Sequence, residues 1–206
     1  MRADVVAPAG PGELDALVWR TGPSWVASSA SCGGGVGERH WVVNAQVPAN
    51  YQRTDLEAHA SELARAFALD GDGVTLFTAA SVRRVREAAD AGVYVQATVG
   101  VAHPTWAAAD DTDAPTGPGT INVVAFAPVR WAPGALLNAL VTATEAKTQA
   151  LLELGIPGTG TASDAICVVC PLEGPSEPFA GPRSHWGAAL ARAVHACVLA
   201  GAVAPS

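Results

Sequence analysis

The sequence predicts a single α+β domain, residues 1–206, in which mostly antiparallel β-sheet packs against long helices. Three observations favour this fold. Half of the residues are apolar and only 15% are charged, which is typical of a chain with a sizeable core. Several short strand-like stretches follow one another without a helix between them, which favours antiparallel pairing. Two long apolar stretches in the second half carry helix signals at both ends.

The first half of the chain predicts short strands and one clear helix. Residues 1–12 are rich in Pro and Gly and are expected to be a loose tail. Strands are expected at 14–19, 25–31, 41–47, 74–78 and 93–101, with a Gly-rich turn at 32–38. A capping-box pattern, Thr54 with Glu57, opens a helix. Its apolar stripe is Leu56, Ala60, Leu63 and Phe67. Residues 81–90 are expected to form a short helix or arm.

The second half has sharper boundaries. A loop is expected at 103–119 and strands at 120–126 and 165–169. A long helix is predicted at 133–154, with Pro133 in its first turn and Gly155 after its end. The last helix is predicted at 184–203, with Ser184 as its N-cap.

Composition narrows the function classes. The net charge is −7 and no long Lys/Arg cluster occurs, which disfavours nucleic acid or an anionic membrane as a partner. No signal-peptide pattern and no apolar stretch of membrane-spanning length is visible, so the cytoplasm is the expected location. Cys167 and Cys170 have CxxC spacing, but on a strand they point to opposite faces. They are therefore expected to be core residues, and no metal site is predicted.

The long helix carries one polar stripe on an otherwise apolar circumference. Its members are Asn138, Thr142, Glu145 and Gln149, at helical spacing. If the helix is buried all round, the carboxyl of Glu145 is a candidate acid or base, because an unpaired buried carboxylate has a shifted pKa. If the stripe faces solvent or a neighbouring strand, it has no catalytic meaning. The sequence leaves both readings open.

Two loops of Gly and hydroxyl residues flank this helix in the sequence. The first contains Thr120 and Asn122, and the second, 158–164, contains Thr159, Thr161 and Asp164. Such loops present backbone N–H groups and hydroxyls to a ligand, which suits the recognition of an amide, although ordinary turns have the same composition.

An ordered series of motifs resembles the adenosylcobinamide amidohydrolase family. In the second half the series is Gly119-Thr-Ile-Asn122, Ala143-Thr-Glu-Ala-Lys-Thr148, Gly158-Thr-Gly-Thr-Ala-Ser-Asp-Ala165 and Phe179-Ala-Gly-Pro-Arg-Ser-His-Trp-Gly187. In the first half it is Ser28–Gly35, Trp41-Val-Val-Asn-Ala-Gln-Val47, Leu76-Phe-Thr-Ala-Ala80 and Ala97-Thr-Val-Gly100. The resemblance covers roughly residues 25–200. One departure is Ser81, where the family pattern has an acidic residue.

The resemblance implies hydrolysis of adenosylcobinamide to adenosylcobyric acid and 1-amino-2-propanol, in vitamin B12 salvage. It implies no resident cofactor, because the corrinoid substrate carries its own cobalt. On this reading Glu145 is the general acid or base, and Thr120, Asn122 and Lys147 shape the catalytic site. The expected substrate-binding residues are Asn44, Thr78, Asn138, Thr142, Thr159, Thr161, Asp164 and His185. The sequence leaves open whether the chain is a homo-oligomer.

A looser similarity concerns mechanism. A Gly-Thr pair that starts a strand, followed by an Ala-rich helix and an Asp-led strand, is similar to the ornithine acetyltransferase and β-aminopeptidase superfamily. That similarity implies a Thr120 nucleophile released by self-cleavage after Gly119, and a layered sandwich of two sheets between helices. The alternatives to the amidohydrolase are thus a self-processing Thr-nucleophile amidase or acyltransferase, and a corrinoid-binding protein without catalysis.

Overall fold

The computed structural model describes residues 1–6, 14–110 and 119–203. Within these ranges eight strands form one mixed sheet, in the order β4-β3-β2-β9-β7-β6-β5, with β1 paired to β2. Their bounds are β1 Asp4–Val6, β2 Ala16–Ser28, β3 Gly35–Gln46, β4 Gly73–Thr78, β5 Arg86–Asp90, β6 Val93–Gly100, β7 Thr120–Phe126 and β9 Ala165–Cys170. The short strands β8 (Arg130–Trp131) and β10 (Ser176–Glu177) pair with each other. The helices are α1 (Leu56–Ala66), α2 (Pro133–Glu153) and α3 (His185–Ala202).

The sheet curls so that its two halves face each other. Strand β2 pairs with β3 along most of its length, and with β9 through residues 25–28. The β2–β3 register shifts between Arg20 and Ser24, where the strand bends. Side chains then meet across strands that are not neighbours: the Trp19 indole N–H donates to Gln96 of β6 at 2.8 Å. The bend in β2 therefore brings the β2-β3-β4 half against the β5-β6-β7-β9 half.

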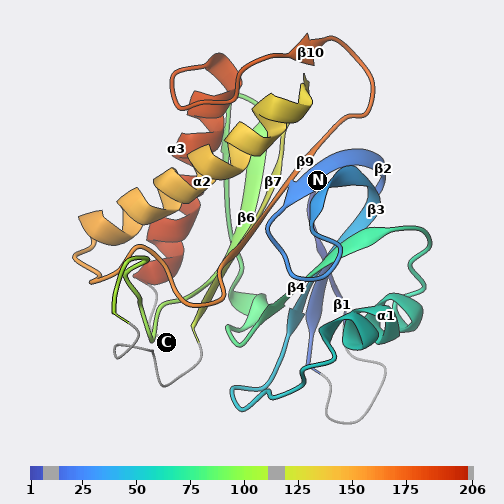
Figure 1. Cartoon of the computed structure of the whole chain (residues 1–206), viewed down its shortest axis with the longest axis vertical. Helices are drawn as coiled ribbons and strands as arrows, with labels where there is room; N and C mark the ends of the chain where they lie inside the picture. The colour runs from blue at the N-terminus through green and yellow to red at the C-terminus, as the bar shows by residue number, and fades with distance from the viewer. Residues whose placement is uncertain (7–13, 111–118, 204–206) are drawn as a thin grey trace.

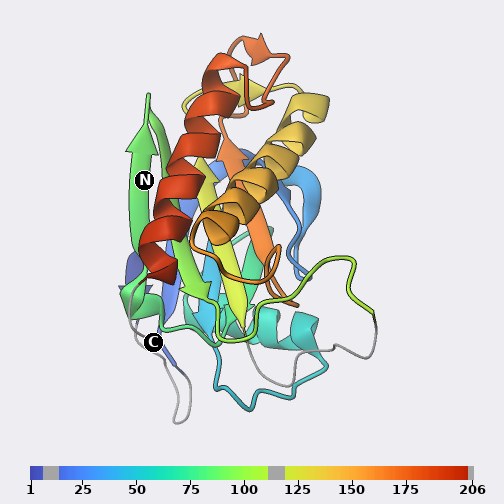
Figure 2. The same ribbon diagram turned by 90° about the vertical axis from the view of Figure 1, so that its left-hand side faces the viewer.

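Three apolar layers follow from this curl. Between the two halves lie residues such as Leu17, Val42 and Val124. Helices α2 and α3 cover the outer face of the β6-β7-β9 half, and α1 covers the outer face of the β2-β3 half. Figure 1 shows α2 and α3 on one side of the strands and α1 on the other, and Figure 2 shows α3 and α2 in front of the sheet. The order of layers is α-β-β-α.

These findings confirm the α+β class and the mostly antiparallel sheet. Five of the pairings in the main sheet are antiparallel, and the pairings β3–β4 and β7–β9 are parallel. The two facing layers belong to one continuous sheet and are not two separate sheets. The long helices begin and end within one residue of the predicted bounds, and Ser184 accepts the Gly187 N–H at 3.1 Å as an N-cap. Cys167 and Cys170 are buried, as expected, and Cys32 and Cys197 are buried as well.

Four details of the prediction are wrong. The stretches 14–19 and 25–31 belong to one bent strand, because β3 pairs with both. Residues 4–6 of the expected tail form β1, while 7–12 lie outside the described residues, as do 111–118 of the expected loop. Residues 82–84 form a 3₁₀ turn and Arg86–Asp90 is a strand, since the tight Ala91–Gly92 turn pairs it with β6. Asp55, and not Thr54, is the N-cap position of α1, and no side chain caps it.

Candidate active site

Polar residues line one end of the space between the two half-sheets. On β7 the side chains alternate, so that Thr120, Asn122 and Val124 point inward while Ile121 and Val123 face α2 and α3. The Asn122 amide donates to Asn44 of β3 at 2.8 Å and to the Phe77 carbonyl at 2.9 Å. The Asn44 amide in turn donates to Thr98 of β6 at 2.9 Å. The interior is thus apolar at depth and polar toward the start of β7.

This polar cluster is buried and incompletely satisfied. The side chains of Asn44, Thr98 and Asn122 belong to residues that are only 1% exposed. Within the described residues, the side-chain oxygen of Asn122 accepts no hydrogen bond. Buried amides without a partner are uncommon in native proteins and concentrate at sites with a role beyond packing. The end of the interior that begins at Thr120 is therefore a candidate functional site.

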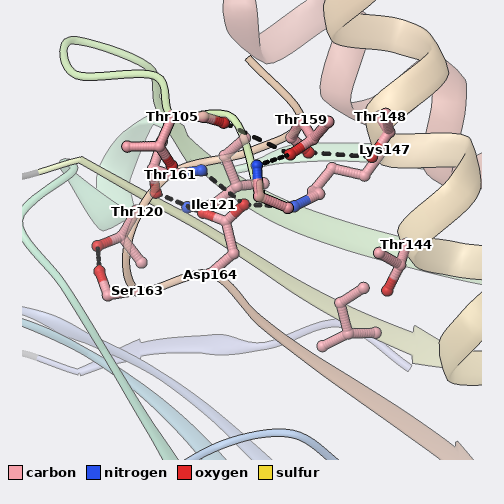
Figure 3. A network of polar contacts seen from close by, with 12 residues as sticks. Thr105, Thr120, Ile121, Thr144, Lys147, Thr148, Thr159, Thr161, Ser163 and Asp164 are labelled. Atoms are coloured by element: carbon pink, nitrogen blue, oxygen red, sulfur yellow. Dashed lines mark hydrogen bonds and ion pairs between the residues drawn. The ribbon is translucent and has the colours of Figure 1, made fainter. Parts of the chain in front are cut away.

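Thr120 carries a hydroxyl whose hydrogen bonds are defined by its neighbours. Its Oγ1 lies 2.7 Å from the Ser163 Oγ (Figure 3). The Ser163 Oγ lies 3.1 Å from the Gly119 carbonyl oxygen. Because a carbonyl only accepts, Ser163 donates to Gly119 and accepts the proton of Thr120. Among the described residues the Thr120 oxygen then accepts no hydrogen bond, which leaves its lone pairs available. That arrangement suits a nucleophilic hydroxyl.

Asp164 holds this segment in place. Its carboxylate accepts the backbone N–H groups of Ile121 at 2.8 Å and Thr161 at 3.0 Å, together with the Thr161 hydroxyl. It also pairs with the Lys147 ammonium from the inner face of α2. The two charged side chains are only 7% and 11% exposed. A buried pair with this many hydrogen bonds is rigid, since losing either partner leaves an uncompensated charge.

Close packing supports the same geometry. A Cβ atom added at Gly160 would collide with both the Lys147 ammonium and the Asp164 carboxylate. The hydroxyl of Thr161 also donates to the Gly119 carbonyl at 2.7 Å. The loop 158–164 and the start of β7 are therefore joined by several short contacts, and the position of Thr120 is defined by the pair of Lys147 and Asp164.

Two clefts meet at Thr120. The first, of about 480 Å³, is named the Tyr51 cleft and is lined by residues 29–31, 47–49, 51, 53, 56, 75–79, 120 and 163–165. The second, of about 620 Å³, is named the Arg84 cleft and is lined by residues 46, 49, 79–81, 84, 99–102, 119, 120, 201 and 202. Both include Ala49, Ala79 and Thr120. A substrate bond placed at Thr120 would have a cleft on each side.

The Tyr51 cleft has an aromatic wall. Phe77 stacks on Tyr51 with ring centroids 5.9 Å apart, and on His59 at 5.1 Å. The Tyr51 hydroxyl lies 2.6 Å from the His59 Nδ1. Burial raises the pKa of Tyr51 above its ordinary value, so this hydroxyl is neutral at physiological pH. The stacked rings of this wall are suited to contact with apolar surface of a ligand.

Most of the predicted site residues converge on this region. Thr78, Thr120 and Asp164 line the Tyr51 cleft. Asn44 and Asn122 lie behind Thr120, while Thr161 and Lys147 hold its backbone. Thr159 accepts from the Ala107 N–H at 3.0 Å and joins two loops.

Four predicted residues lie elsewhere. Glu145, Asn138 and His185 are exposed and line neither cleft. Thr142 is buried, but it donates to the Ala180 carbonyl at 2.9 Å and so closes a loop. The premise that placed Glu145 in a buried pocket is wrong, because α2 is an outer layer that packs with one face only. Its outer face also leaves Leu137, Val141 and Leu152 about half exposed.

The sequence reasoning did not single out Ser163 or Thr98. Ser163 lies within the Gly-and-hydroxyl loop already recognised, but no local pattern shows which hydroxyl of that loop reaches Thr120. Thr98 lies opposite Asn122 in the β6–β7 register, a pairing that the sequence does not reveal. Among the described residues, no group of three or more His, Cys, Asp or Glu side chains is placed to hold a metal ion. No described helix has the length and apolar character needed to cross a membrane.

Comparison with known proteins places this chain in a family. The family model for adenosylcobinamide amidohydrolase matches residues 7–205, and the chain belongs to that family. The chain is 30% identical over 184 residues to the adenosylcobinamide amidohydrolase of Methanosarcina mazei, which covers 85% of this chain and 88% of that protein. It is 35% identical over 145 residues to the Halobacterium salinarum protein of the same name, covering 66% of this chain and 62% of that protein.

Among solved structures, the crystal structure of the PH0078 protein from Pyrococcus horikoshii OT3 aligns with a TM-score of 0.48 and 10% identity. That alignment covers 98% of this chain and 80% of the other.

Proposed function

We propose that this chain hydrolyses the amide that joins the aminopropanol arm of adenosylcobinamide to the corrin ring, in cobinamide salvage. The products are adenosylcobyric acid and 1-amino-2-propanol. The observation that carries the proposal is the family match over residues 7–205, together with a hydroxyl pair at the junction of two clefts. An amide bond lying at Thr120 has its acyl half in one cleft and its amine half in the other.

In this proposal the Thr120 hydroxyl attacks the amide carbonyl. Its proton passes to the Ser163 oxygen, and the Ser163 proton passes to the departing amine nitrogen, so that the C–N bond breaks and an ester with Thr120 forms. Water then attacks the ester and gives its proton to the Ser163 oxygen, while the Ser163 proton passes to the departing Thr120 oxygen, so that the C–O bond breaks, the carboxylic acid is released and the Thr120 hydroxyl is restored. The 2.7 Å contact between the two hydroxyls supports this relay.

The remaining residues act on position and shape. Lys147, Asp164 and Thr161 hold the backbone at Thr120, which keeps the nucleophile oriented. Thr78 lines the Tyr51 cleft beside Thr120, and Asn44 and Asn122 form a buried polar layer behind it. Orientation of this kind contributes to rate because the reacting groups need not be ordered in the transition state.

The test is to incubate the purified protein with adenosylcobinamide and to follow adenosylcobyric acid and aminopropanol by liquid chromatography and mass spectrometry. Both products should appear in equal amounts with multiple turnovers. Saturable binding of adenosylcobinamide without either product would instead assign a corrinoid-binding protein. The Ser163→Ala variant should be slower, because it loses the relay hydroxyl.

We also propose that the reaction uses no resident metal, takes place in the cytoplasm and involves a free small-molecule corrinoid. The net charge of −7 disfavours nucleic acid as a partner. Turnover should be the same before and after dialysis against EDTA. A loss that added divalent ions restore would refute the metal-independent mechanism.

A second candidate function is self-processing between Gly119 and Thr120, with transfer of an acyl group by the freed Thr120. The specific observation is that the Gly119 carbonyl accepts two hydroxyls, from Thr161 at 2.7 Å and Ser163 at 3.1 Å, which polarise it toward attack. Denaturing mass spectrometry separates the two cases. One chain of 20.8 kDa supports the intact hydrolase, and two fragments that meet at this bond support self-processing.

A further inference from the structure

Among the described residues four polar side chains line the Arg84 cleft, and one of them is charged. They are Gln46, Ser81, Arg84 and Thr120, and Arg84 is the one charged residue among the lining residues. The Gln46 oxygen accepts the Val82 N–H at 3.2 Å, which anchors the 3₁₀ turn that carries Arg84. The amide nitrogen of Gln46 is thereby left for a ligand. No carboxylate lines this cleft within the described residues.

Arg84 differs from the other cations near Thr120 because its charge is not paired with a described carboxylate. In the Tyr51 cleft Arg53 is held by Asp55 at 2.8 Å and Glu62 at 2.6 Å, and Lys147 is paired with Asp164. Arg83, which precedes Arg84 in the 3₁₀ turn, pairs with Asp15. The exposed guanidinium of Arg84 makes no hydrogen bond or ion pair with any described residue. The positive charge available to an incoming anion therefore lies on one side of Thr120.

We infer that the Arg84 cleft holds the acyl half of the substrate, and that Arg84 binds the carboxylate that amide hydrolysis creates. This inference rests on the proposed function and adds a direction to it: the amine leaves through the Tyr51 cleft. The substrate amide is neutral and the product is an anion, so Arg84 contacts the product more strongly than the substrate. Arg84 is a binding residue for the product and sets how tightly it is retained.

The shape of the cleft agrees with this assignment. A Cβ added at Gly100 would lie 3.2 Å from the Ala80 Cβ and 3.3 Å from the Thr120 carbonyl oxygen, so a side chain here would narrow the cleft beside the nucleophile. Its remaining lining residues include Ala102, Gly119 and Ala202, which are small. Small walls leave Arg84 and Thr120 facing a common space that a propionate arm can enter.

The experiment measures binding of adenosylcobyric acid to the full chain by equilibrium dialysis at low ionic strength, with no turnover required. Arg84→Gln should bind it three- to tenfold more weakly, the range of about one exposed charge-assisted pair. The KM for adenosylcobinamide should rise by a smaller factor.

Arg83→Gln, the matched control on the same turn, should bind the product as the wild type does, and Arg84→Lys should recover most of the affinity. Inorganic phosphate should compete with the product in the wild type and not in Arg84→Gln.

Three results would overturn the inference: no binding of adenosylcobyric acid by the wild type, equal binding by Arg84→Gln, or the same loss in Arg83→Gln. An anion on the amine arm is the other source of a negative charge, and adenosylcobinamide phosphate tests it. If Arg84→Gln weakens the binding of this phosphate ester more than the binding of adenosylcobyric acid, the Arg84 cleft holds the amine half of the substrate and the inference is wrong. Failure of the proposed function is separate, because it appears as absent hydrolysis by the wild type.

Discussion

Asp164 is the residue on which the geometry of the site depends. It accepts two backbone N–H groups, one hydroxyl and the Lys147 ammonium, and it lies behind the Thr120 segment. Breaking a buried pair by removing one partner costs about 3–5 kcal/mol, because the other charge stays buried and unpaired. A single substitution of Asp164 is therefore expected to change both the stability of the fold and the position of Thr120.

We predict that Asp164→Asn and Lys147→Met each lower the free energy of unfolding by about 3 kcal/mol. The double variant should lose less than the sum of the two, because it leaves no lone charge. Urea unfolding followed by circular dichroism gives all three values. Additive losses, or single losses below about 0.5 kcal/mol, would show that the pair does not couple.

At this scale the sequence indicated the right loops but not their contacts. Thr120, Thr161 and Asp164 were found from Gly and hydroxyl patterns next to strands. Ser163 was missed, since its contact with Thr120 joins residues 43 positions apart. Asn138 and His185 were chosen from motifs that the fold places away from the clefts. Local chemistry predicts which residue types meet a ligand, while the pairing of strands decides which of them meet each other.

Helix α2 illustrates the same limit for an element. Pro133 and Gly155 defined its ends correctly, because these residues act locally. Its orientation was not predictable, since Ala, Leu and Val occur around most of its circumference. The buried face includes Ala139, Ala143 and Lys147, and of the polar stripe Thr142 is buried while Asn138, Glu145 and Gln149 lie on the outside. The charged residue of α2 that contacts the site is thus Lys147, on the apolar face, and not Glu145, on the polar stripe.

We predict that Glu145→Gln retains hydrolysis within twofold of the wild type, because the carboxylate is exposed and lines neither cleft. Initial rates with adenosylcobinamide at several concentrations provide the measurement. A loss of kcat by a hundredfold in a folded variant would return Glu145 to the catalytic centre and would refute the site described above.

For the molecule as a whole, the curl of one sheet creates the site. The bend in β2 sets β3 against β7, and the two asparagines that bond across this gap lie directly behind Thr120. Composition and strand order predicted the class, and the similarity to the ornithine acetyltransferase and β-aminopeptidase superfamily implied the α-β-β-α layers. They did not predict that one bent strand would serve both layers, because a register shift depends on the partner strand.

The exposed ion pairs predict how the whole fold responds to acid. Hydrogen bonds from Arg53 lower the pKa of Asp55 to about 2, and hydrogen bonds from Arg192 lower the pKa of Asp90. A folded pKa below the unfolded value means that the stabilisation is present above the unfolded pKa and is lost as pH falls through the folded one. The urea midpoint should therefore drop as pH falls from about 4 to about 2.

The matched control is Arg192→Gln, which removes the partner of Asp90 and should reduce this acid dependence. Urea midpoints at a series of pH values test both statements. A midpoint that stays constant across this range in the wild type would show that these pairs do not contribute to folding.

The decisive measurement compares Thr120→Val with Thr144→Val as adenosylcobinamide hydrolases. Both substitutions replace a hydroxyl by a methyl group, but Thr144 lies on the exposed face of α2, and among the described residues its hydroxyl bonds only the Leu140 carbonyl of its own helix. We expect Thr120→Val to lower kcat by about a thousandfold or more, as loss of a nucleophile does, and Thr144→Val to match the wild type. A folded Thr120→Val variant that releases adenosylcobyric acid at the wild-type rate would show that Thr120 is not the nucleophile.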